Sequence, residues 1–325
     1  MTARYVAVRL LLVVPVALTA SIIVFGIMRI LPGDVAIVIL SGSGEATHSV
    51  EAREALREEL GLNDPLPIQY GMWLWHMVNG DFGGRSLVDG QPIRSMVSRQ
   101  LPVTALVVFY AMAISMALWI PMGILATWQR GRWLDHLVRV IMLPGQSIPS
   151  FVIAVLVLLG LLWALGWSPP IVYAGPLDDP WGHLQIVVWP VALLAWEYGA
   201  HVVRVTRASM LEALHEEYTF VARAKGLPEH VILLRHVLRN AWPPIIATLG
   251  LQLGALLSTT LILESIFGLP GIGRGLVDAV LARDFPVVQS LVTLLVVGTL
   301  LVNLALDLTA AQADPRIASV TRSEQ

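Results

Sequence analysis

Long apolar runs separated by shorter polar segments make up most of this sequence. A helix of about 20 apolar residues crosses the hydrocarbon core of a bilayer, which is about 30 Å thick. Runs of that length cover residues 10–31, 103–128, 137–165, 184–203, 245–266 and 288–311. The pattern therefore predicts an all-α integral membrane protein with about six transmembrane helices.

Two of these runs carry further information. The first run continues well past the poor cleavage site at 17–20, which favours a retained anchor over a cleaved signal peptide. The third run is interrupted between Pro144 and Pro149. Irregular backbone at membrane depth needs protein or water around its polar groups, so we expect this break inside the helix bundle or near its cytoplasmic edge.

The long polar segment 32–102 predicts a small helical insertion outside the cytoplasm. A charged helix is expected at about 50–60, ending at Gly61, and a second helix at about 68–79. The apolar face of the second helix would consist of Ile68, Met72 and Trp75. The aromatic side chains expected to anchor it at the lipid interface, or alternatively to dock a partner, are Tyr70, Trp73 and Trp75.

The segment 204–244 is rich in arginine and too long for a simple connection between two spans. It predicts a helical stretch from Met210 to Lys225, a break at 226–228, and a second helix over 229–240 that ends before two prolines at 243 and 244. Such a helix pair can transmit movement of a soluble partner into the spans. A solvated loop with a charged face is the alternative.

Composition narrows the possible chemistry. Of the 325 residues 56% are hydrophobic, 14% are charged and none is cysteine, which excludes disulfides and thiolate sites. Lys225 is the only lysine and follows Ala224, so the chain has no phosphate-binding loop of the Gly-Lys-Ser/Thr type. His215-Glu216 is followed by Thr219 where a zinc protease has its second histidine. The sequence thus predicts no catalytic residues, no metal site and no cofactor in this chain.

Positive charge is distributed unevenly between the loops. With the N-terminus inside, the inner segments hold Arg4, Arg9, Arg130, Arg132, Arg139, Arg204, Arg207, Arg223, Lys225, Arg235, Arg239, Arg316 and Arg322. The opposite loop 166–183 holds none. Because positive residues near span ends stay in the cytoplasm, both termini are expected there.

Several short motifs, in their order and spacing, carry a resemblance to a known family. The strongest are Tyr218 to Leu227 and Leu234 to Ala241; others are Leu31 to Asp34, Gly80 to Gly83, Thr206 to Leu211, Glu264 to Gly273, Arg283 to Gln289 and Asp314 to Ile317. They resemble permease subunits of ABC importers in the dipeptide, oligopeptide and nickel group. Two features depart from the general importer loop: Phe220-Val221-Ala222 replaces Glu-Ala-Ala, and the later Ile-x-Leu-Pro element is missing.

The resemblance implies a role and a set of partners. The chain would form half of a translocation path for di- or oligopeptides, or a similar small solute, in a bacterial cytoplasmic (inner) membrane. Its partners would be a homologous second permease, two cytoplasmic ATPase subunits that bind ATP and Mg, and an extracytoplasmic solute-binding protein, with no nucleic acid. Import of a nickel complex or another small solute is the alternative within the family, and an ion-coupled secondary transporter is the alternative of a different class.

The same resemblance divides the chain and assigns residues. The expected parts are an N-terminus and first span (1–31), the insertion (32–102), a five-helix permease core (103–311) with the coupling loop 204–244, and a cytoplasmic tail (312–325). Coupling to the ATPases is expected of Tyr218, Ala222, Arg223, Ala224, Lys225, Gly226, Leu227, Arg235, His236, Arg239 and Asn240.

Polar residues inside the apolar runs are candidates for the solute path, since a charge in a membrane helix is costly unless it is paired or hydrated. They are Glu197, Tyr198, His201 and Gln252. The structural alternative is an ion pair between Glu197 and His201 one turn apart, and a bond from Gln252 to a neighbouring helix.

Overall fold

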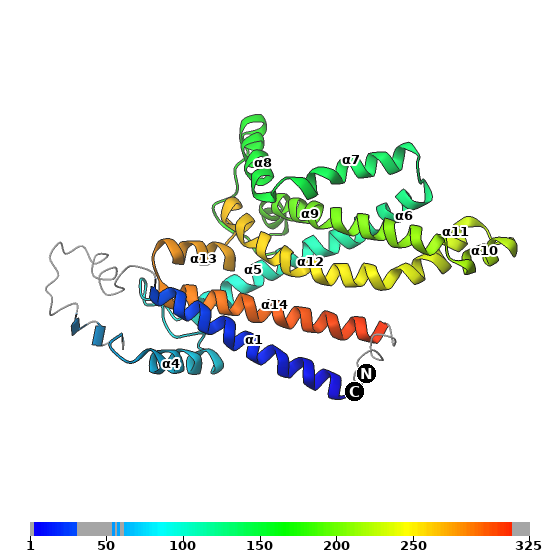
Figure 1. Cartoon of the computed structure of the whole chain (residues 1–325). Coiled ribbons are helices and arrows are strands. Elements are labelled where there is room, and N and C mark those ends of the chain that lie inside the picture. The colour runs from blue at the N-terminus through cyan, green and yellow to red at the C-terminus, as the bar shows by residue number, and fades with distance from the viewer. Residues whose placement is uncertain (1–2, 31–53, 56, 59–61, 314–325) are drawn as a thin grey trace. The chain divides into compact units, whose positions relative to one another are not determined.

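The computed structural model describes residues 3–30, 54–55, 57–58 and 62–313, and this part of the chain is helical, with a single isolated β-bridge between Arg85 and Pro92 (Figure 1). Its elements are α1 (Ala3–Ile30), α4 (Leu66–Val78), α5 (Ile93–Ile114), η1 (Ser115–Trp119), α6 (Ile120–Trp128), α7 (Trp133–Ser147), α8 (Ser150–Leu165), α9 (Pro180–Leu214), α10 (Glu217–Ala224), α11 (Glu229–Val231), η2 (Ile232–Val237), α12 (Leu238–Phe267), α13 (Ile272–Leu281) and α14 (Phe285–Ala313). The predictions for a helix at 50–60 and for the tail at 312–325 fall mostly outside the described residues.

The prediction of about six spans is confirmed. Within the described residues, five helices are long and apolar enough to cross a membrane, and a sixth span is formed if the bent pair α7 and α8 is counted as one. Several helices are longer than the apolar runs they contain. Helix α9, for example, has 35 residues, whereas its apolar run covers residues 184–203. At about 1.5 Å per residue it exceeds the roughly 30 Å hydrocarbon core, so its end must extend beyond the membrane.

The break in the third span lies later than the first proline suggests. Helix α7 runs through Pro144 to Ser147, and a 96° bend follows before α8. Ile148 has extended backbone angles of φ −109° and ψ 128° because the ring of Pro149 excludes the helical conformation at the preceding residue. Gly145 faces α9, where a Cβ would lie 3.4 Å from the Trp196 carbonyl.

The chain forms two compact units. Unit 1 contains residues 1–6, 105–269 and 302–325, and unit 2 contains residues 7–104 and 270–301. The boundaries between the units fall within helices α5 and α14, so each of these helices contributes residues to both units.

Helix α9 is the centre of unit 1. It packs most extensively against α12, and also against α6, α7 and η1; Figure 1 shows α9 and α12 side by side. Small or slender side chains dominate the α6–α7–α9 core, where the buried residues are Ala126, Val138, Met142, Ala200 and Val203. Small residues let membrane helices approach closely, which replaces the hydrophobic driving force available in water.

The closest approach in this core involves Gly199 of α9. A Cβ built on Gly199 would lie 1.9 Å from Cδ1 of Trp119, so only glycine fits. The π-helical turn η1 directs Trp119 and Ser115 toward α9, and both donate hydrogen bonds to the Ala195 carbonyl, at 2.8 and 3.0 Å.

We therefore expect Gly199→Ala to destabilise the protein by about 1–3 kcal/mol through overpacking. Gly160→Ala is the matched control, because Gly160 is also a helical glycine in a span, but a Cβ added there would have no other atom within 4 Å. Thermal unfolding in detergent measures both variants. An equal melting temperature for the two would contradict the close packing described.

Unit 2 corrects one expectation about the insertion. Helix α4 exposes Ile68, Met72 and Trp75 on one face, as predicted. Trp73, however, is 8% exposed and donates to Ser290 Oγ at 3.4 Å, and the Tyr70 hydroxyl lies 2.8 Å from Ser21 Oγ. Both aromatic rings therefore fix α4 inside the unit, and of the three expected lipid anchors only Trp75 has an exposed side chain.

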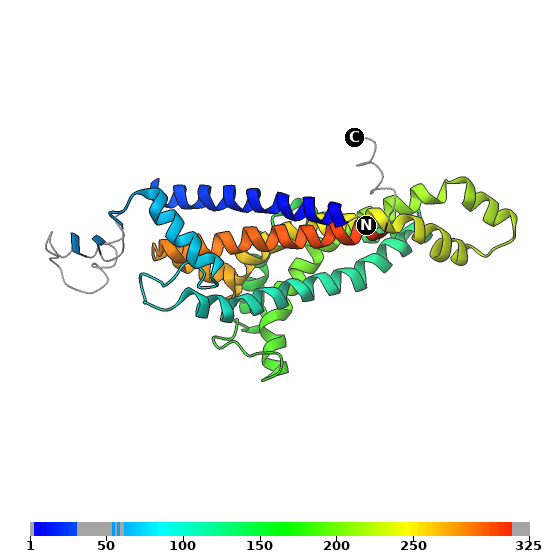
Figure 2. The same ribbon diagram turned by 90° about the horizontal axis from the view of Figure 1, so that it is seen from below.

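The other contacts of unit 2 fasten its N-terminal part to α13 and α14. Residues 7–30 of α1 and 285–301 of α14 run alongside each other in both views (Figure 2), with Met28 packed against the buried cluster that includes Val288 and Leu291. Thr104 Oγ1 accepts the Ile272 N–H at 2.9 Å and so caps α13.

Candidate functional site

The segment between α9 and α12 forms a helical hairpin, which we call the coupling hairpin (residues 215–237). Helix α9 ends at Leu214, α10 follows after a two-residue break, and α11 with η2 returns toward α12. Figure 2 shows this hairpin at the far ends of α9 and α12, beyond the parts of both helices that pack together. It is therefore held outside the apolar part of unit 1, where a soluble partner can reach it.

Gly226 makes the turn of the hairpin. Its φ of +78° is a left-handed conformation that favours glycine. The Gly226 N–H donates to the Arg223 carbonyl at 2.9 Å, and the Leu227 N–H donates to the Ala222 carbonyl at 3.3 Å. These two bonds form a Schellman motif that satisfies the last carbonyls of α10.

An ion pair closes the hairpin across this turn. Arg223 Nη2 lies 2.7 Å from Glu229 Oε1, and its Nε donates to Oε2 at 3.2 Å. The hydrogen bonds to Glu229 raise the pKa of the Arg223 guanidinium above its ordinary value. Both side chains are nearly half exposed, so the pair contributes orientation more than stability.

One side of α10 is fixed to the membrane helices. Thr219 is 1% exposed and its hydroxyl donates to the carbonyls of Leu214 and Glu216, and Ala222 is 6% exposed. On the returning arm Ile232, Leu233 and Val237 are buried. The hairpin is thus a rigid attachment of the bundle, not a loose loop.

The opposite side of α10 presents apolar side chains to solvent. Phe220 is 75% exposed and Val221 is 50% exposed, with Leu227 at 38% beside them. Sequence reasoning assigned no coupling role to Phe220 and Val221. Helical spacing could have predicted their exposure, because residues 219 and 222 lie on one face of the helix and residues 220 and 221 lie on the other.

The residues assigned to coupling are spread over both faces of the hairpin and the first turn of α12. Ala222 is buried, Tyr218 and His236 are partly buried, and the others are exposed: Arg223, Ala224, Lys225, Gly226, Leu227, Arg235, Arg239 and Asn240. The hydroxyl of Tyr218 is buried without a hydrogen-bond partner. Tyr218 lines a hollow together with Glu212, Glu216 and Asn240.

The expected end of the returning helix before Pro243 is wrong. Helix α12 continues through both prolines to Phe267. The buried positions recur every four residues, from Val237 at the end of η2 to Ala241, Ile245 and Leu249 of α12, while Trp242 and Pro244 face outward. Packing of this apolar stripe against α9 outweighs the hydrogen bonds that the two prolines remove.

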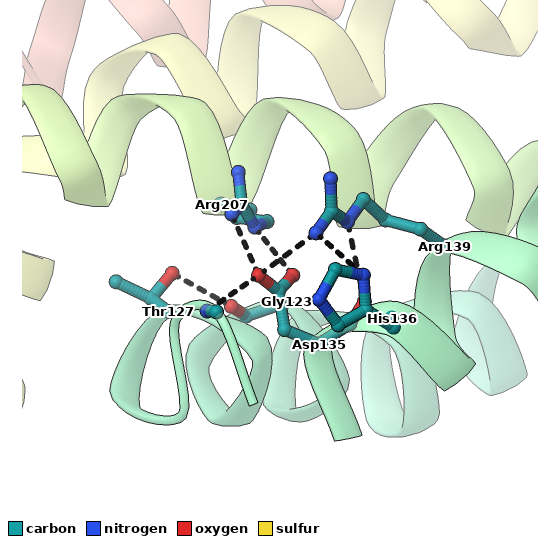
Figure 3. A network of polar contacts seen from close by, with 7 residues as sticks. Gly123, Thr127, Asp135, His136, Arg139 and Arg207 are labelled. Atoms are coloured by element: carbon teal, nitrogen blue, oxygen red, sulfur yellow. Dashed lines mark hydrogen bonds and ion pairs between the residues drawn. The ribbon is translucent and has the colours of Figure 1, made fainter. Parts of the chain in front are cut away.

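A buried ionic network lies where α9 meets the α6–α7 turn (Figure 3). The Asp135 side chain is 0% exposed and binds Arg207 through two bonds, Nε–Oδ1 at 2.8 Å and Nη2–Oδ2 at 2.9 Å. Arg139 Nη2 adds a contact at 3.2 Å and the Gly131 N–H another at 3.0 Å. Parallel Arg–carboxylate bonds are strong and directional, so they lock this turn to the stretch of α9 that precedes the hairpin.

The four path candidates fall into different environments. Tyr198 is 3% exposed and its hydroxyl donates to the Leu249 carbonyl at 2.5 Å, which favours a structural link between α9 and α12. His201 lies 3.0 Å from Arg204 instead of pairing with Glu197. Gln252 is partly exposed on α12.

Glu197 is the remaining candidate. Its Oε2 atom is buried without a hydrogen-bond partner, while Ser150 at the start of α8 bonds to the carboxylate. Among the described residues no group of histidine and carboxylate side chains could hold a metal ion.

A family comparison decides what kind of protein carries this architecture. Residues 119–319 match the family described as the binding-protein-dependent transport system inner membrane component. The chain belongs to this family. The matched residues include α9, the coupling hairpin and α12, and the protein is a transmembrane permease subunit of an ABC importer.

Curated relatives match over nearly the whole chain. A peptide transport system permease protein of Brucella abortus is 39% identical over 306 residues, covering 94% of this permease and 95% of the relative. A dipeptide transport system permease of Alkalihalophilus pseudofirmus is 35% identical, covering 95% and 97%. A glutathione transport system permease of Escherichia coli K12 is 34% identical, covering 97% and 98%.

A solved structure supports the fold. The permease resembles a chain of an inward-facing methionine ABC transporter with a TM-score of 0.57 at 18% identity, covering 69% of this chain and 99% of that one. At this identity the likeness concerns the fold alone.

Proposed function

We propose that this permease forms half of an import path for di- or oligopeptides and that its coupling hairpin is the docking surface for a cytoplasmic ATPase subunit. The observation that carries the proposal is the apolar side of α10, where Phe220 and Val221 are exposed on a helix fixed to the bundle. An exposed apolar pair next to Arg223 and Lys225 has the composition of a protein interface.

The remaining parts of the importer follow from this assignment. ATP and Mg bind to partner ATPase subunits, and this chain holds no cofactor and catalyses no covalent step. A homologous second permease supplies the other half of the path, and an extracytoplasmic solute-binding protein delivers the solute. The names of the curated relatives, which refer to peptides, dipeptides and glutathione, support a peptide as the solute.

Docking is tested by co-purification of the permease with its ATPase subunits. We expect Phe220→Ser to lower the amount of ATPase recovered at least tenfold, because a buried aromatic anchor contributes on the order of 2 kcal/mol or more to an interface and about 1.4 kcal/mol is a factor of ten. The control is Val88→Ser, which removes an apolar side chain that is 56% exposed and far along the chain from the hairpin. Equal ATPase recovery from both variants would refute the assignment of this surface.

The proposed orientation places both termini and the hairpin in the cytoplasm. It is supported by charge: the end of unit 1 with the α6–α7 turn and the hairpin carries Arg130, Arg132, Arg139, Arg204 and Arg207, whereas the loop 166–179 before α9 carries no positive residue.

The natural absence of cysteine allows a direct test of this orientation. Single cysteines at Gly90 and Asp178 are expected to react with a membrane-impermeant maleimide added outside intact cells. Single cysteines at Gly131 and Glu216 are expected to react only after the membrane is opened. Labelling of Glu216→Cys from outside would reverse the orientation.

A further inference from the structure

A pocket in unit 2 is lined by side chains of α1, α4 and α14 and of the segments that flank α4. Its volume is about 220 Å³, and its lining includes Phe25, Met28, Arg29, Gln69, Met72 and Gln289. No aspartate or glutamate is among the described residues that line it. The described lining therefore combines an apolar wall with the Arg29 guanidinium and the His76 imidazole, whose Nδ1 lies 3.4 Å from Asp81 Oδ2.

Two glutamines leave polar atoms unsatisfied at this pocket. Gln69 is 8% exposed and its Nε2 donates to the carbonyls of Leu62 and Asp64, at 3.1 and 2.7 Å, so Oε1 remains without a donor. Gln289 is 5% exposed, and its Nε2 has no acceptor. Since each unsatisfied buried group costs about 1–3 kcal/mol, a ligand that supplies both an acceptor and a donor would remove a real penalty.

Arg29 adds charge at the edge of the membrane. It is the last residue but one of the apolar stretch Leu11–Ile30, and its guanidinium lies over the Phe25 ring at 5.0 Å from the centroid. No described carboxylate forms an ion pair with it. An arginine at a span end often reaches toward the headgroup region. This tendency of arginine does not explain why two glutamine atoms in the same pocket, Gln69 Oε1 and Gln289 Nε2, have no hydrogen-bond partner.

We propose that this pocket binds the headgroup of an anionic phospholipid. The phosphate accepts hydrogen bonds from Arg29 and from Gln289 Nε2, and a headgroup hydroxyl donates to Gln69 Oε1. A lipid fits better than a soluble anion because the apolar wall of Phe25, Met28 and Met72 continues into the exposed apolar face of α4, where acyl chains can lie. This site is separate from the coupling hairpin and does not depend on transport.

Binding can be measured on the purified full chain in detergent by native mass spectrometry with dioctanoyl phosphatidylglycerol as the probe. We expect Arg29→Gln and Gln289→Leu each to weaken binding about tenfold, the loss of one charge-assisted hydrogen bond. The control is Arg99→Gln, which removes an equal charge from an exposed site in the same unit, where Arg99 binds Gln91 at 2.8 Å. It should change binding less than about twofold, because the field of an exposed charge is largely screened by solvent and salt.

Two further measurements distinguish headgroup binding from loss of folding and from binding of a soluble anion. Arg29→Lys retains the charge and should retain most of the binding, which separates a headgroup contact from a general loss of folding. Glycerol phosphate, which has the phosphate but no acyl chains, should compete poorly. Equal phosphatidylglycerol binding by wild type, Arg29→Gln and Gln289→Leu would overturn the site, and equal competition by glycerol phosphate or a free dipeptide would overturn the lipid as its ligand.

Discussion

Replacing Gly226 by valine is expected to abolish coupled transport while leaving the permease inserted in the membrane. The φ of +78° at Gly226 is costly for a β-branched residue, and the two Schellman bonds would be lost with it. The exposed face of α10 would then be presented at the wrong angle to a partner. A proline in place of Ala224 should have the same effect by breaking the last turn of α10. Peptide uptake and ATPase activity in reconstituted vesicles measure both variants.

Gly166→Val is the matched control for this experiment. Gly166 also follows a helix, α8, with a positive φ of 62° and open space around it, so the local strain is comparable. Along the chain Gly166 precedes α9, whereas the hairpin follows α9. Uptake should persist in this control. Full uptake with assembled ATPases in Gly226→Val would show that the turn geometry has no part in coupling.

The second large effect is expected from the buried network around Asp135. Removing the charge of Arg207 leaves the fully buried Asp135 carboxylate without its bidentate partner, which costs about 3–5 kcal/mol when a buried pair is broken. Arg207→Gln should therefore lower the stability of the permease severely. Arg139→Gln is the matched control, because the Arg139 side chain is 52% exposed and should cost less than about 1 kcal/mol.

A double-mutant cycle gives the physical reason for the loss. Asp135→Asn combined with Arg207→Gln removes both charges, so this double variant should be more stable than Arg207→Gln alone. Unfolding of the purified permease in mixed detergent micelles provides the free energies. If Arg207→Gln proved no more costly than Arg139→Gln, the network would not hold the α6–α7 turn to α9.

The sequence was sufficient for features that depend on local chemistry. Apolar length located the spans, and the glycine at 226 located the turn of the hairpin, because one residue type meets the need there. Features that depend on tertiary packing could not be predicted from the sequence. The stripe Val237, Ala241 and Ile245 carries α12 through two prolines, and only the packed helices show that this stripe is buried.

The candidate site shows the same division. In the sequence, Arg139 and Arg207 served only to orient the spans. The structure shows that both bind Asp135, which is 72 residues away from Arg207 in the chain, so the sequence alone did not reveal this structural role. Trp73 is of the residue type that anchors helices at the lipid interface, but its side chain is buried and donates a hydrogen bond to Ser290. Phe220 and Val221 could have been found from helical spacing, since their neighbours 219 and 222 share the buried face.

The central claim is that the exposed side of α10 contacts an ATPase subunit. Its most direct test places a photo-crosslinking benzoylphenylalanine at Phe220 in the assembled importer, with the same residue at Val88 as the control. We predict an adduct between the permease and an ATPase subunit from position 220 and none from position 88. Absence of an ATPase adduct from position 220, in a preparation that hydrolyses ATP and takes up peptide, would contradict the claim.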